Sequence, residues 1–580
     1  MTTPQLEKIH IAILGGGPSG LFMFKRLVES GRTDIAVTIF ERKNKLGSGM
    51  PYSAEGANDE HITNVSGNEI PAMVTSLNDW MKTISKDSLD KYHLDAAHFN
   101  EFKVLPRLLF GQYLSAQFGL LQKRARENGL EFTVQYNSEV TDIIDQPEQQ
   151  QVTVEINGKE RHSFDRVIIC TGHNWPKKHE GLVPNYFDSP YPPAKLGMQL
   201  NHPVAIKGSS LTAVDAVRTL SRHNGAFRKD PKGKLKYQLY EDSANFKMIL
   251  HTRNGMLPAV RFHLEDSHLS NDELLTKEEI AVHRQSNDGF LSLDYIFERD
   301  FKRPIKAKEP EFYERIKDLN VEEFVAEMLA LREELNPFQL LKAEYAEAEK
   351  SIKQKRSVYW KEMLGVLSFA LNYPAKHLSA EDMQRLQRSL TPLISIVIAY
   401  IPQSSSEELS ALHEAGVLDL IPVGEESHVA PRETGGAIYH YTDETGAAQA
   451  VHFETYVDCV GQPHLSYEQF PFKSLLTNQT ISPARLRYRS PEEARKDLAA
   501  GKPVIKDQNN DYYLQVPGIT INDHFQVVDK YGALNERIYI MAVPYIGGYN
   551  PDYSGLDFSE AASQLVLDSL FDQPQIQQTA

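Results

Sequence analysis

The stretch Lys8–Arg42, KIHIAILGGGPSGLFMFKRLVESGRTDIAVTIFER, decides the fold of this chain. Its apolar run Ile9–Leu14 suits a buried strand and stops at Gly15–Gly20, which satisfies the pattern G-x-G-x-x-G. Apolar residues then recur at roughly helical spacing from Leu21, and a second apolar run ends on Glu41. This order of strand, turn, helix, strand and acid predicts a dinucleotide-binding βαβ unit. A glycine-rich turn without a ligand is the alternative.

Each residue of this first turn has a physical role in such a unit. Gly15 permits the tight turn, Gly17 lets a pyrophosphate approach the backbone, and Gly20 lets the helix pack on the strand. The free N–H groups and the dipole of the new helix favour a diphosphate here. The acid is expected to hold the adenosine ribose hydroxyls. The candidate binding residues are Gly15, Gly17, Pro18, Ser19, Gly20, Glu41 and Arg42.

Length and composition limit the class of protein. The 580 residues predict two to four domains, and 41% hydrophobic with 24% charged residues is ordinary for a globular protein. A net charge of −16 argues against general binding of nucleic acid or of an anionic membrane. The longest strongly apolar window, Leu393–Ile401, is too short to span a bilayer, and the N-terminus lacks a secretory pattern, so a cytoplasmic location is expected. With only Cys170 and Cys459, neither a disulfide framework nor a multi-cysteine metal site is expected.

Three stretches after the second strand are candidates for contact with the dinucleotide. Residues 47–53 hold two close glycines, which suits a backbone lying against a ligand, and Asn64 could hydrogen-bond a ring system or simply make a turn. Arg107, near the start of a helix, is unfavourable for the helix dipole unless an anion lies nearby; a solvated surface arginine is the alternative. The candidates from these stretches are Ser48, Gly49, Met50, Asn64, Val65 and Arg107.

Three alternating runs, 132–136, 140–144 and 152–156, read as strands of a meander that leads to the buried strand 167–169. That strand ends on a cysteine and a glycine, which allows the chain to pass close beside a bound dinucleotide. The candidates here are Val140, Thr171, Gly172 and His173.

A second nucleotide unit is predicted from His202 onward. Strand 203–207 is followed by the relaxed pattern G-x-S-x-x-A at 208–213, a helix, a polar insertion at 222–245 and strand 246–250. Where the first unit has Glu41, this unit has Arg253, a cation that would favour the extra phosphate of NADP. A structural βαβ unit without a nucleotide is the alternative. The candidates are Gly208, Ser209, Ser210, Thr212 and Arg253.

The remaining chain completes both units. Residues 265–390 have few strand signals and apolar residues at helical spacing, which predicts a helical insertion. Strand 456–459 then repeats the pattern of strand 167–170, so the two cysteines occupy equivalent turns as small buried residues rather than catalytic groups. A late strand, a glycine loop with Gly547 and a helix from about Phe558 to Leu570 follow. The predicted segments are 1–200 and 465–580 for the first unit, 201–264 and 391–464 for the second, and 265–390 between them.

On these features the chain resembles the bacterial FAD/NAD(P)-binding family of the two-dinucleotide flavoprotein superfamily. The resemblance runs along nearly the whole chain. It rests on GGGPSG at 15–20, GSGMPYS at 47–53, HITNV at 61–65, LPRLLFGQYL at 105–114, ICTGH at 169–173, GSSLTAVD at 208–215 and RNGMLP at 253–258. It implies an α/β fold with two Rossmann-like, three-layer β/β/α domains around a helical insertion, with FAD in the first unit and NADPH in the second.

The layout is also similar to class B flavin monooxygenases, including N-hydroxylases. Some members of this wider set N-oxygenate small amino acids, as nitrosuccinate synthase does with aspartate. The class B signature F-x-G-x-x-x-H is absent, because residues 180–188 lack its histidine. The resemblance therefore implies the cofactors more directly than the reaction.

The expected function is an FAD-dependent, NADPH-consuming monooxygenase that N-oxygenates a small amine or amino acid through a peroxyflavin, with O₂ as co-substrate and no metal. Two alternatives stay open: a flavin reductase passing electrons to another acceptor, and a flavin-binding sensing or partner-docking protein. Homo-oligomerisation is possible. The candidate substrate-site residues are Arg261, Tyr545, Tyr549 and Tyr553, which follow glycines or strand ends.

Overall fold

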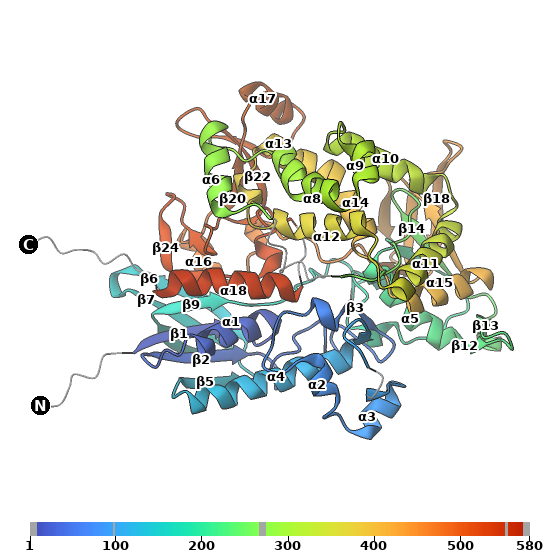
Figure 1. The fold of residues 1–580 in the computed structure, drawn as a ribbon, viewed down its shortest axis with the longest axis horizontal. Coiled ribbons are helices and arrows are strands. Elements are labelled where there is room, and N and C mark those ends of the chain that lie inside the picture. The colour runs from blue at the N-terminus through green and yellow to red at the C-terminus, as the bar shows by residue number, and fades with distance from the viewer. Residues whose placement is uncertain (1–7, 97–98, 266–273, 552–554, 572–580) are drawn as a thin grey trace, which may run out of the picture.

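The computed structural model describes residues 8–96, 99–265, 274–551 and 555–571. Within them the chain forms two main sheets, one mostly and one wholly parallel, each at the centre of its own unit, and a helical region that packs on both (Figure 1). The first sheet belongs to what we call the first unit and the second sheet to the second unit. The predicted α/β class with two Rossmann-like units and a helical insertion is confirmed.

The first unit is built on a six-stranded sheet of order β23-β24-β9-β1-β2-β5. Its strands are β1 (Ile9–Leu14), β2 (Ile35–Glu41), β5 (Glu131–Tyr136), β9 (Arg166–Ile169), β23 (Gln526–Val528) and β24 (Leu534–Ile540). All pairs except β23 with β24 are parallel. Because the chain leaves β1 toward β2 and returns to β9 on its other side, the order of the strands reverses beside β1. In open α/β sheets this reversal is where ligands bind.

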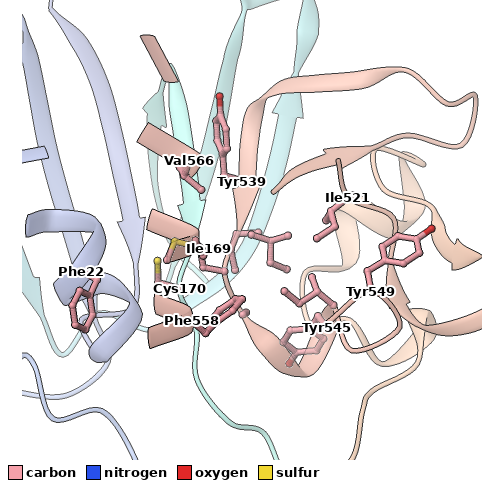
Figure 2. Packing of buried hydrophobic residues seen from close by; sticks show 14 of the residues in the cluster. Phe22, Ile169, Cys170, Ile521, Tyr539, Tyr545, Tyr549, Phe558 and Val566 are labelled. Atoms are coloured by element: carbon pink, nitrogen blue, oxygen red, sulfur yellow. The ribbon is translucent and has the colours of Figure 1, made fainter. Parts of the chain in front are cut away.

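Both faces of this sheet are covered. Helices lie on one face, namely α1 (Pro18–Glu29), α4 (Arg107–Glu127) and α18 (Leu556–Phe571), and the other face carries the antiparallel meander β6 (Val140–Gln146), β7 (Gln151–Ile156) and β8 (Glu160–Phe164). Figure 2 shows Phe558 and Val566 of α18 packed near Ile169 and Cys170 at the end of β9. The predicted meander grouping was wrong in one strand: residues 132–136 pair with β2 in the main sheet, because a strand that follows a crossover helix returns parallel to its neighbour.

The second unit repeats this plan on a five-stranded parallel sheet of order β10-β19-β11-β14-β15. Its strands are β10 (Tyr186–Phe187), β11 (Pro203–Lys207), β14 (Lys247–Thr252), β15 (Leu418–Pro422) and β19 (Thr455–Asp458). Its helices are α5 (Leu211–Asn224) and α15 (Gln403–Glu414), and its meander is β16 (His428–Pro431), β17 (Ala437–Thr442) and β18 (Ala448–Phe453). The polar insertion forms a hairpin of β12 (Gly225–Lys229) and β13 (Leu235–Leu239).

The helical region lies between the two halves of the second unit. Its helices are α6 (Lys277–Ser286), α7 (Leu293–Ile296), α8 (Arg303–Lys308), α9 (Pro310–Ile316), α10 (Val321–Glu333), α11 (Pro337–Gln354), α12 (Tyr359–Leu371), α13 (Ala380–Arg385) and α14 (Thr391–Val397). Thr276 and Asn320 start α6 and α10 as capping boxes, a local signal for helix initiation. The helices continue to Val397, past the expected boundary at 390, because Pro392 is tolerated in the first turn of α14.

The core shows how the helical region is attached. Leu364 of α12 and Leu393 of α14 belong to the same buried apolar cluster as Ile13 and Ile540 of the first sheet. Helix α11 instead contributes Phe338 to the core of the second unit. The helical region therefore packs on both units. The C-terminal segment adds the sheet β20 (Pro483–Arg487), β21 (Val504–Lys506) and β22 (Tyr512–Ile519), with α16 (Lys473–Thr477) and α17 (Pro491–Ala499).

Candidate dinucleotide-binding sites

The two predicted turns have the same backbone geometry. Gly15 and Gly208 both have positive φ, +108° and +102°, which favours glycine. A Cβ atom on Gly15 would lie 2.6 Å from the carbonyl oxygen of Cys170, and one on Gly208 would lie 2.9 Å from that of Cys459. Because glycine has no side chain, each turn can pack directly against the backbone at the end of the neighbouring strand, β9 in the first unit and β19 in the second. The expected equivalence of the two cysteines is confirmed, and both are buried.

The helix after each turn begins without a side-chain cap. Gly17, which has no side chain, precedes α1, and Ser210, whose hydroxyl makes no capping hydrogen bond, precedes α5. The first N–H groups of a helix have no partner inside it and attract anions together with the helix dipole. Both helix starts are therefore suited to a phosphate.

A cavity of about 870 Å³, which we call the main cavity, lies at the first turn. Its lining follows the carboxyl ends of β2, β1, β9 and β24, from Glu41 through Gly15 and Cys170 to Met541. It includes most candidates predicted for the first unit: Gly15, Gly17, Pro18, Ser19, Glu41, Arg42, Ser48, Gly49, Met50, Asn64, Val65, Arg107, Val140, Thr171, Gly172 and His173.

Two candidates of the first unit lie outside the lining. Gly20 has a packing role, because a Cβ there would lie 2.1 Å from the carbonyl oxygen of Gly15. Gly547 faces the ring of His464, which a Cβ would approach to 1.7 Å. Close packing against His464 therefore explains why residue 547 is a glycine. Sequence reasoning missed Leu556 and Ser559, which enter the lining because α18 starts beside α1.

Glu41 lies at one end of the main cavity with its carboxylate fixed in place. One oxygen accepts a hydrogen bond from Gly16 N–H at 2.9 Å and the other from Lys43 N–H at 2.8 Å. Each carboxylate oxygen has a second lone pair, so the side chain keeps capacity for hydroxyl donors. This is the geometry expected of an acid that holds ribose hydroxyls.

Two unpaired polar atoms in the main cavity support a fit to a ligand. The hydroxyl oxygen of Thr171 and Nδ1 of His173 are buried and have no hydrogen-bond partner among the described residues. Burial lowers the pKa of His173, although Gln462 opposes this, and the imidazole is therefore neutral near pH 7. Unpaired buried polar atoms are costly unless something binds them. The residues present therefore fit a polar dinucleotide such as FAD.

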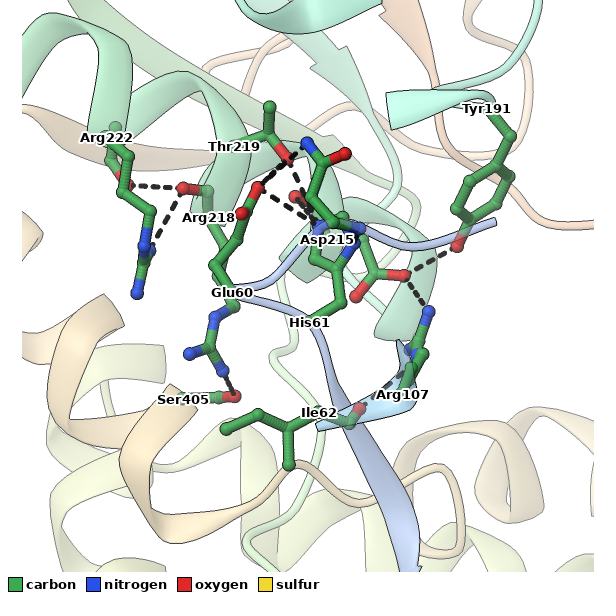
Figure 3. Close-up of polar contacts among 12 residues, drawn as sticks. Glu60, His61, Ile62, Arg107, Tyr191, Asp215, Arg218, Thr219, Arg222 and Ser405 are labelled. Atoms are coloured by element: carbon green, nitrogen blue, oxygen red, sulfur yellow. Dashed lines mark hydrogen bonds and ion pairs between the residues drawn. The ribbon is translucent and has the colours of Figure 1, made fainter. Parts of the chain in front are cut away.

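Arg107 joins the two units (Figure 3). Its guanidinium lies 2.5 Å from the carboxylate of Asp215 on α5 and donates a hydrogen bond to the carbonyl of Ile62 at 3.1 Å. The hydroxyl of Tyr191 donates to the same carboxylate at 2.6 Å. Burial alone would raise the pKa of Asp215, but Arg107, His61 and Tyr191 hold it below its usual value. The alternative of a solvated surface arginine is therefore wrong. The side chain of Arg107 also lines the main cavity.

His61 continues this interface and is fully buried. Its Nδ1 accepts a hydrogen bond from Asn58 N–H at 2.9 Å, and its Nε2 lies 3.1 Å from both the Asp215 carbonyl and the Thr219 hydroxyl. Burial lowers the pKa of His61. Thr219 of α5 also donates a hydrogen bond to Glu60 at 2.7 Å, so polar contacts fix α5 against the first unit (Figure 3). Farther along α5, Arg218 and Arg222 form ion pairs with Glu408 of α15 within the second unit.

In the second unit, pairing with the first strand shows which residues correspond. Leu14 pairs with Phe40, and Lys207 pairs with His251, so the counterpart of Glu41 is Thr252. Arg253 lies one residue farther on and is exposed. The expected equivalence of Arg253 and Glu41 was therefore wrong by one position, because the polar insertion obscured the register. The turn also holds Ser209, whose hydroxyl donates to the carbonyl of Met256 at 2.7 Å; Ser210 and Thr212 follow at the helix start.

The four substrate-site candidates have different surroundings. Arg261 is buried, forms an ion pair with Glu69 at 2.6 Å and lies over the Tyr400 ring. Tyr549 exchanges hydrogen bonds with the backbone of Arg485 and is not part of the cavity lining. The contacts of Arg261 and Tyr549 therefore connect segments of the fold, a role that their positions in the sequence could not show. Tyr545 does line the main cavity, and Tyr553 lies outside the described residues.

A second cavity of about 340 Å³, the side pocket, adjoins the main cavity. The two share Asn64, Val65, Leu211, Gly555 and Leu556 in their linings. Helices α12 and α14 form the opposite wall of the side pocket. The helical region therefore covers a space that opens toward the dinucleotide cavity.

Neither a membrane-crossing helix nor a metal-binding cluster is present among the described residues. No helix there has the length and apolar character needed to cross a membrane. No group of three or more His, Cys, Asp or Glu side chains in the same residues could hold a metal ion.

Comparison with known families agrees with the geometry. Residues 12–174 match the FAD-NAD(P)-binding family model, and residues 276–398 match the model described as the YdhS-like middle domain. The second match coincides with the helical region. The fold, the two turns and the first match define the class: a protein with an FAD-NAD(P)-binding domain and two dinucleotide-type turns.

Within this class, the chain is 27% identical over 514 residues to "Uncharacterized protein YdhS" of Escherichia coli K12, covering 87% of this chain and 90% of that protein. Among solved structures it is similar to the cadaverine monooxygenase DfoA of Erwinia amylovora, with 12% identity, 97% and 94% of the two chains covered and a TM-score of 0.43. It is also similar to L-lysine 6-monooxygenase of Pseudomonas syringae, with 12% identity, 97% of this chain and 98% of that chain covered, and a TM-score of 0.40.

Proposed function

We propose that this protein is an FAD-dependent, NADPH-consuming monooxygenase that N-oxygenates a small amine or amino acid. The balanced reaction converts an amine, O₂, NADPH and a proton into a hydroxylamine, water and NADP⁺. FAD, when bound, would supply hydride acceptance and oxygen activation; the protein supplies binding, orientation and exclusion of water. Aspartate is the amino-acid candidate that the resemblance to nitrosuccinate synthase suggests.

One observation carries this proposal. Leu211, the first residue of α5, lines both the main cavity and the side pocket. The helix start suited to the nicotinamide dinucleotide thus borders the space for the flavin and the space for a third molecule. Three partners meeting at one point is what a hydride transfer followed by oxygen transfer requires.

The residues of the main cavity have distinct roles in this proposal. The uncapped start of α1 would bind the diphosphate, and the fixed carboxylate of Glu41 would accept hydrogen bonds from ribose hydroxyls. The Thr171 hydroxyl oxygen and Nδ1 of His173, atoms without a hydrogen-bond partner among the described residues, would bind polar atoms of the cofactor. Arg253 would contact the adenosine phosphate of NADPH from its exposed position.

The chain offers less support for the rival functions. A disulfide reductase needs two neighbouring cysteines, but Cys170 and Cys459 are both buried at separate strand ends, and burial raises the pKa of each thiol. A sensing protein would not need the side pocket beside the flavin space. A reductase that passes electrons to another acceptor remains the second candidate, supported by the same pair of dinucleotide turns.

The decisive experiment follows NADPH oxidation in the presence of ¹⁸O₂ and a panel of amines and amino acids. We expect one substrate class to stimulate NADPH oxidation and to yield a product carrying one labelled oxygen atom. Oxidation that no amine stimulates, with hydrogen peroxide as the sole oxygen product, would instead establish the reductase. Tight flavin binding with no NADPH oxidation at all would favour the sensing protein.

A further inference from the structure

The side pocket is mostly apolar. Its walls include Phe369 and Leu371 of α12, Ile394 of α14 and Leu556 of α18. Its volume of about 340 Å³ lies at the low end of the roughly 300–1,000 Å³ found for ligand pockets. The walls therefore suit a small ligand with an aliphatic body.

Within this apolar lining, Ser368 of α12 has an unsatisfied hydroxyl. The side chain is 2% exposed, and its oxygen has no hydrogen-bond partner among the described residues. A buried hydroxyl without a partner costs free energy, which a ligand with an N–H or O–H group would recover. This observation indicates a polar end on the ligand.

The charge of the side-pocket lining indicates which polar group the ligand carries. Its ionisable carboxylates are Glu69 and Asp557, and it holds no Lys, Arg or His among the described residues. Glu69 is already neutralised by its ion pair with Arg261 at 2.6 Å. Asp557 accepts a hydrogen bond from Phe558 N–H at 2.9 Å but forms no ion pair within the described residues. The described wall therefore carries one uncompensated negative charge.

We infer that the side pocket is the substrate site and that it takes a primary amine with an aliphatic body, bound through Asp557 and Ser368. This inference rests on the proposed function for its reaction, but not for its binding. An alkylammonium ion matches the carboxylate, the free hydroxyl and the apolar walls together. A dicarboxylic amino acid such as aspartate matches none of them, because it would bring two negative charges to an acidic, apolar pocket. The geometry thus favours an aliphatic amine over aspartate.

The test measures binding of n-hexylamine to the flavin-loaded protein by isothermal titration calorimetry. We expect Asp557→Asn to weaken binding about ten- to a hundred-fold, the range for a lost hydrogen bond to a charged group. Ser368→Ala should weaken it by a smaller factor. Asp568→Asn is the matched control, because Asp568 lies on the same helix, is partly buried and is absent from the pocket lining. It should leave binding unchanged.

A second variant guards against a folding defect. Ser368→Leu keeps every charge but fills the pocket from α12, and it should abolish hexylamine binding while flavin absorbance and the melting temperature are retained. Equal hexylamine affinity in Asp557→Asn and Asp568→Asn, or binding that survives Ser368→Leu, would overturn the inference. So would aspartate binding more tightly than hexylamine.

The outcomes separate this inference from the proposed function. Hexylamine that binds through Asp557 but gives no oxygenated product with any amine would sustain the site and refute the monooxygenase. An oxygenated product formed only from acidic amino acids would sustain the monooxygenase and refute the assigned substrate class.

Discussion

The guanidinium of Arg107 lies 2.5 Å from the carboxylate of Asp215, and this contact joins α4 of the first unit to α5 of the second. Asp215 is only 4% exposed, so the pair is shielded from solvent. The same arginine lines the main cavity, while α5 begins at the second dinucleotide turn. The ion pair therefore sets how the two units meet at the point where their cofactors would approach each other.

Removing this contact should destabilise the protein. Asp215→Asn leaves Arg107 buried without its counter-charge, which typically costs about 3–5 kcal/mol of unfolding free energy. Because the pKa of Asp215 is lowered in the folded state, the wild-type contribution is present above the unfolded value of about 3.9 and is lost as the pH falls below it. Urea unfolding at pH 7 and pH 3 checks this. A variant equal to wild type at pH 7 would contradict it.

Flavin binding should depend on the space beside Gly17. We expect Gly17→Asp to lose bound FAD, because its carboxylate would place bulk and negative charge where the uncapped start of α1 favours a diphosphate. Absorbance of the purified protein near the flavin bands reports this. The matched control is Gly119→Asp, an exposed site on α4 with nothing within 4 Å of a new Cβ. A yellow Gly17→Asp protein with full flavin content would refute the assigned turn.

Arg253 should set the choice of nicotinamide cofactor. A charge-assisted contact with the adenosine phosphate is worth about 1.5–3 kcal/mol, or about ten- to a hundred-fold in affinity. Arg253→Ala should therefore raise the KM for NADPH much more than the KM for NADH. Arg228→Ala, an exposed cation on β12 of the same unit, should change neither. Equal increases for both cofactors in Arg253→Ala would assign the arginine to structure instead.

The second unit should lose stability in mild acid through His251. This side chain is 1% exposed, and its ring stacks on Tyr439 at 4.1 Å. Burial lowers its pKa to about 4, partly opposed by the backbone near Ile206 and Ile249. In the unfolded chain this histidine has a pKa near 6.5. The buried neutral ring therefore contributes about 3 kcal/mol to the free energy of unfolding above pH 6.5, and this contribution is lost as the pH falls toward 4.

His251→Phe should remove this part of the pH dependence, because phenylalanine keeps the stacked ring without a proton-binding atom. Melting temperatures measured between pH 7 and pH 4.5 check this, with the exposed His428→Phe on β16 as the control. If His251→Phe retained the full acid sensitivity of the wild type, another group would be responsible.

The sequence by itself determined the two dinucleotide units, because their signals are local. The strand, the glycine turn and the helix start lie within a few residues of each other, so Gly15 and Gly208 could be identified from spacing alone. The equivalence of Cys170 and Cys459 followed from the same local pattern. Most predicted residues of the first unit line the main cavity for this reason.

Only the tertiary structure decided which distant residues meet. Arg107 and Asp215 are 108 positions apart, and Arg261 reaches Glu69 across 192 positions, so neither ion pair leaves a local trace in the sequence. Tyr549, predicted to be near the substrate, is instead held by the backbone of Arg485. The side pocket likewise depends on α12, α14 and α18 packing together, and packing between elements is set by the fold and not by the periodicity of any one of them.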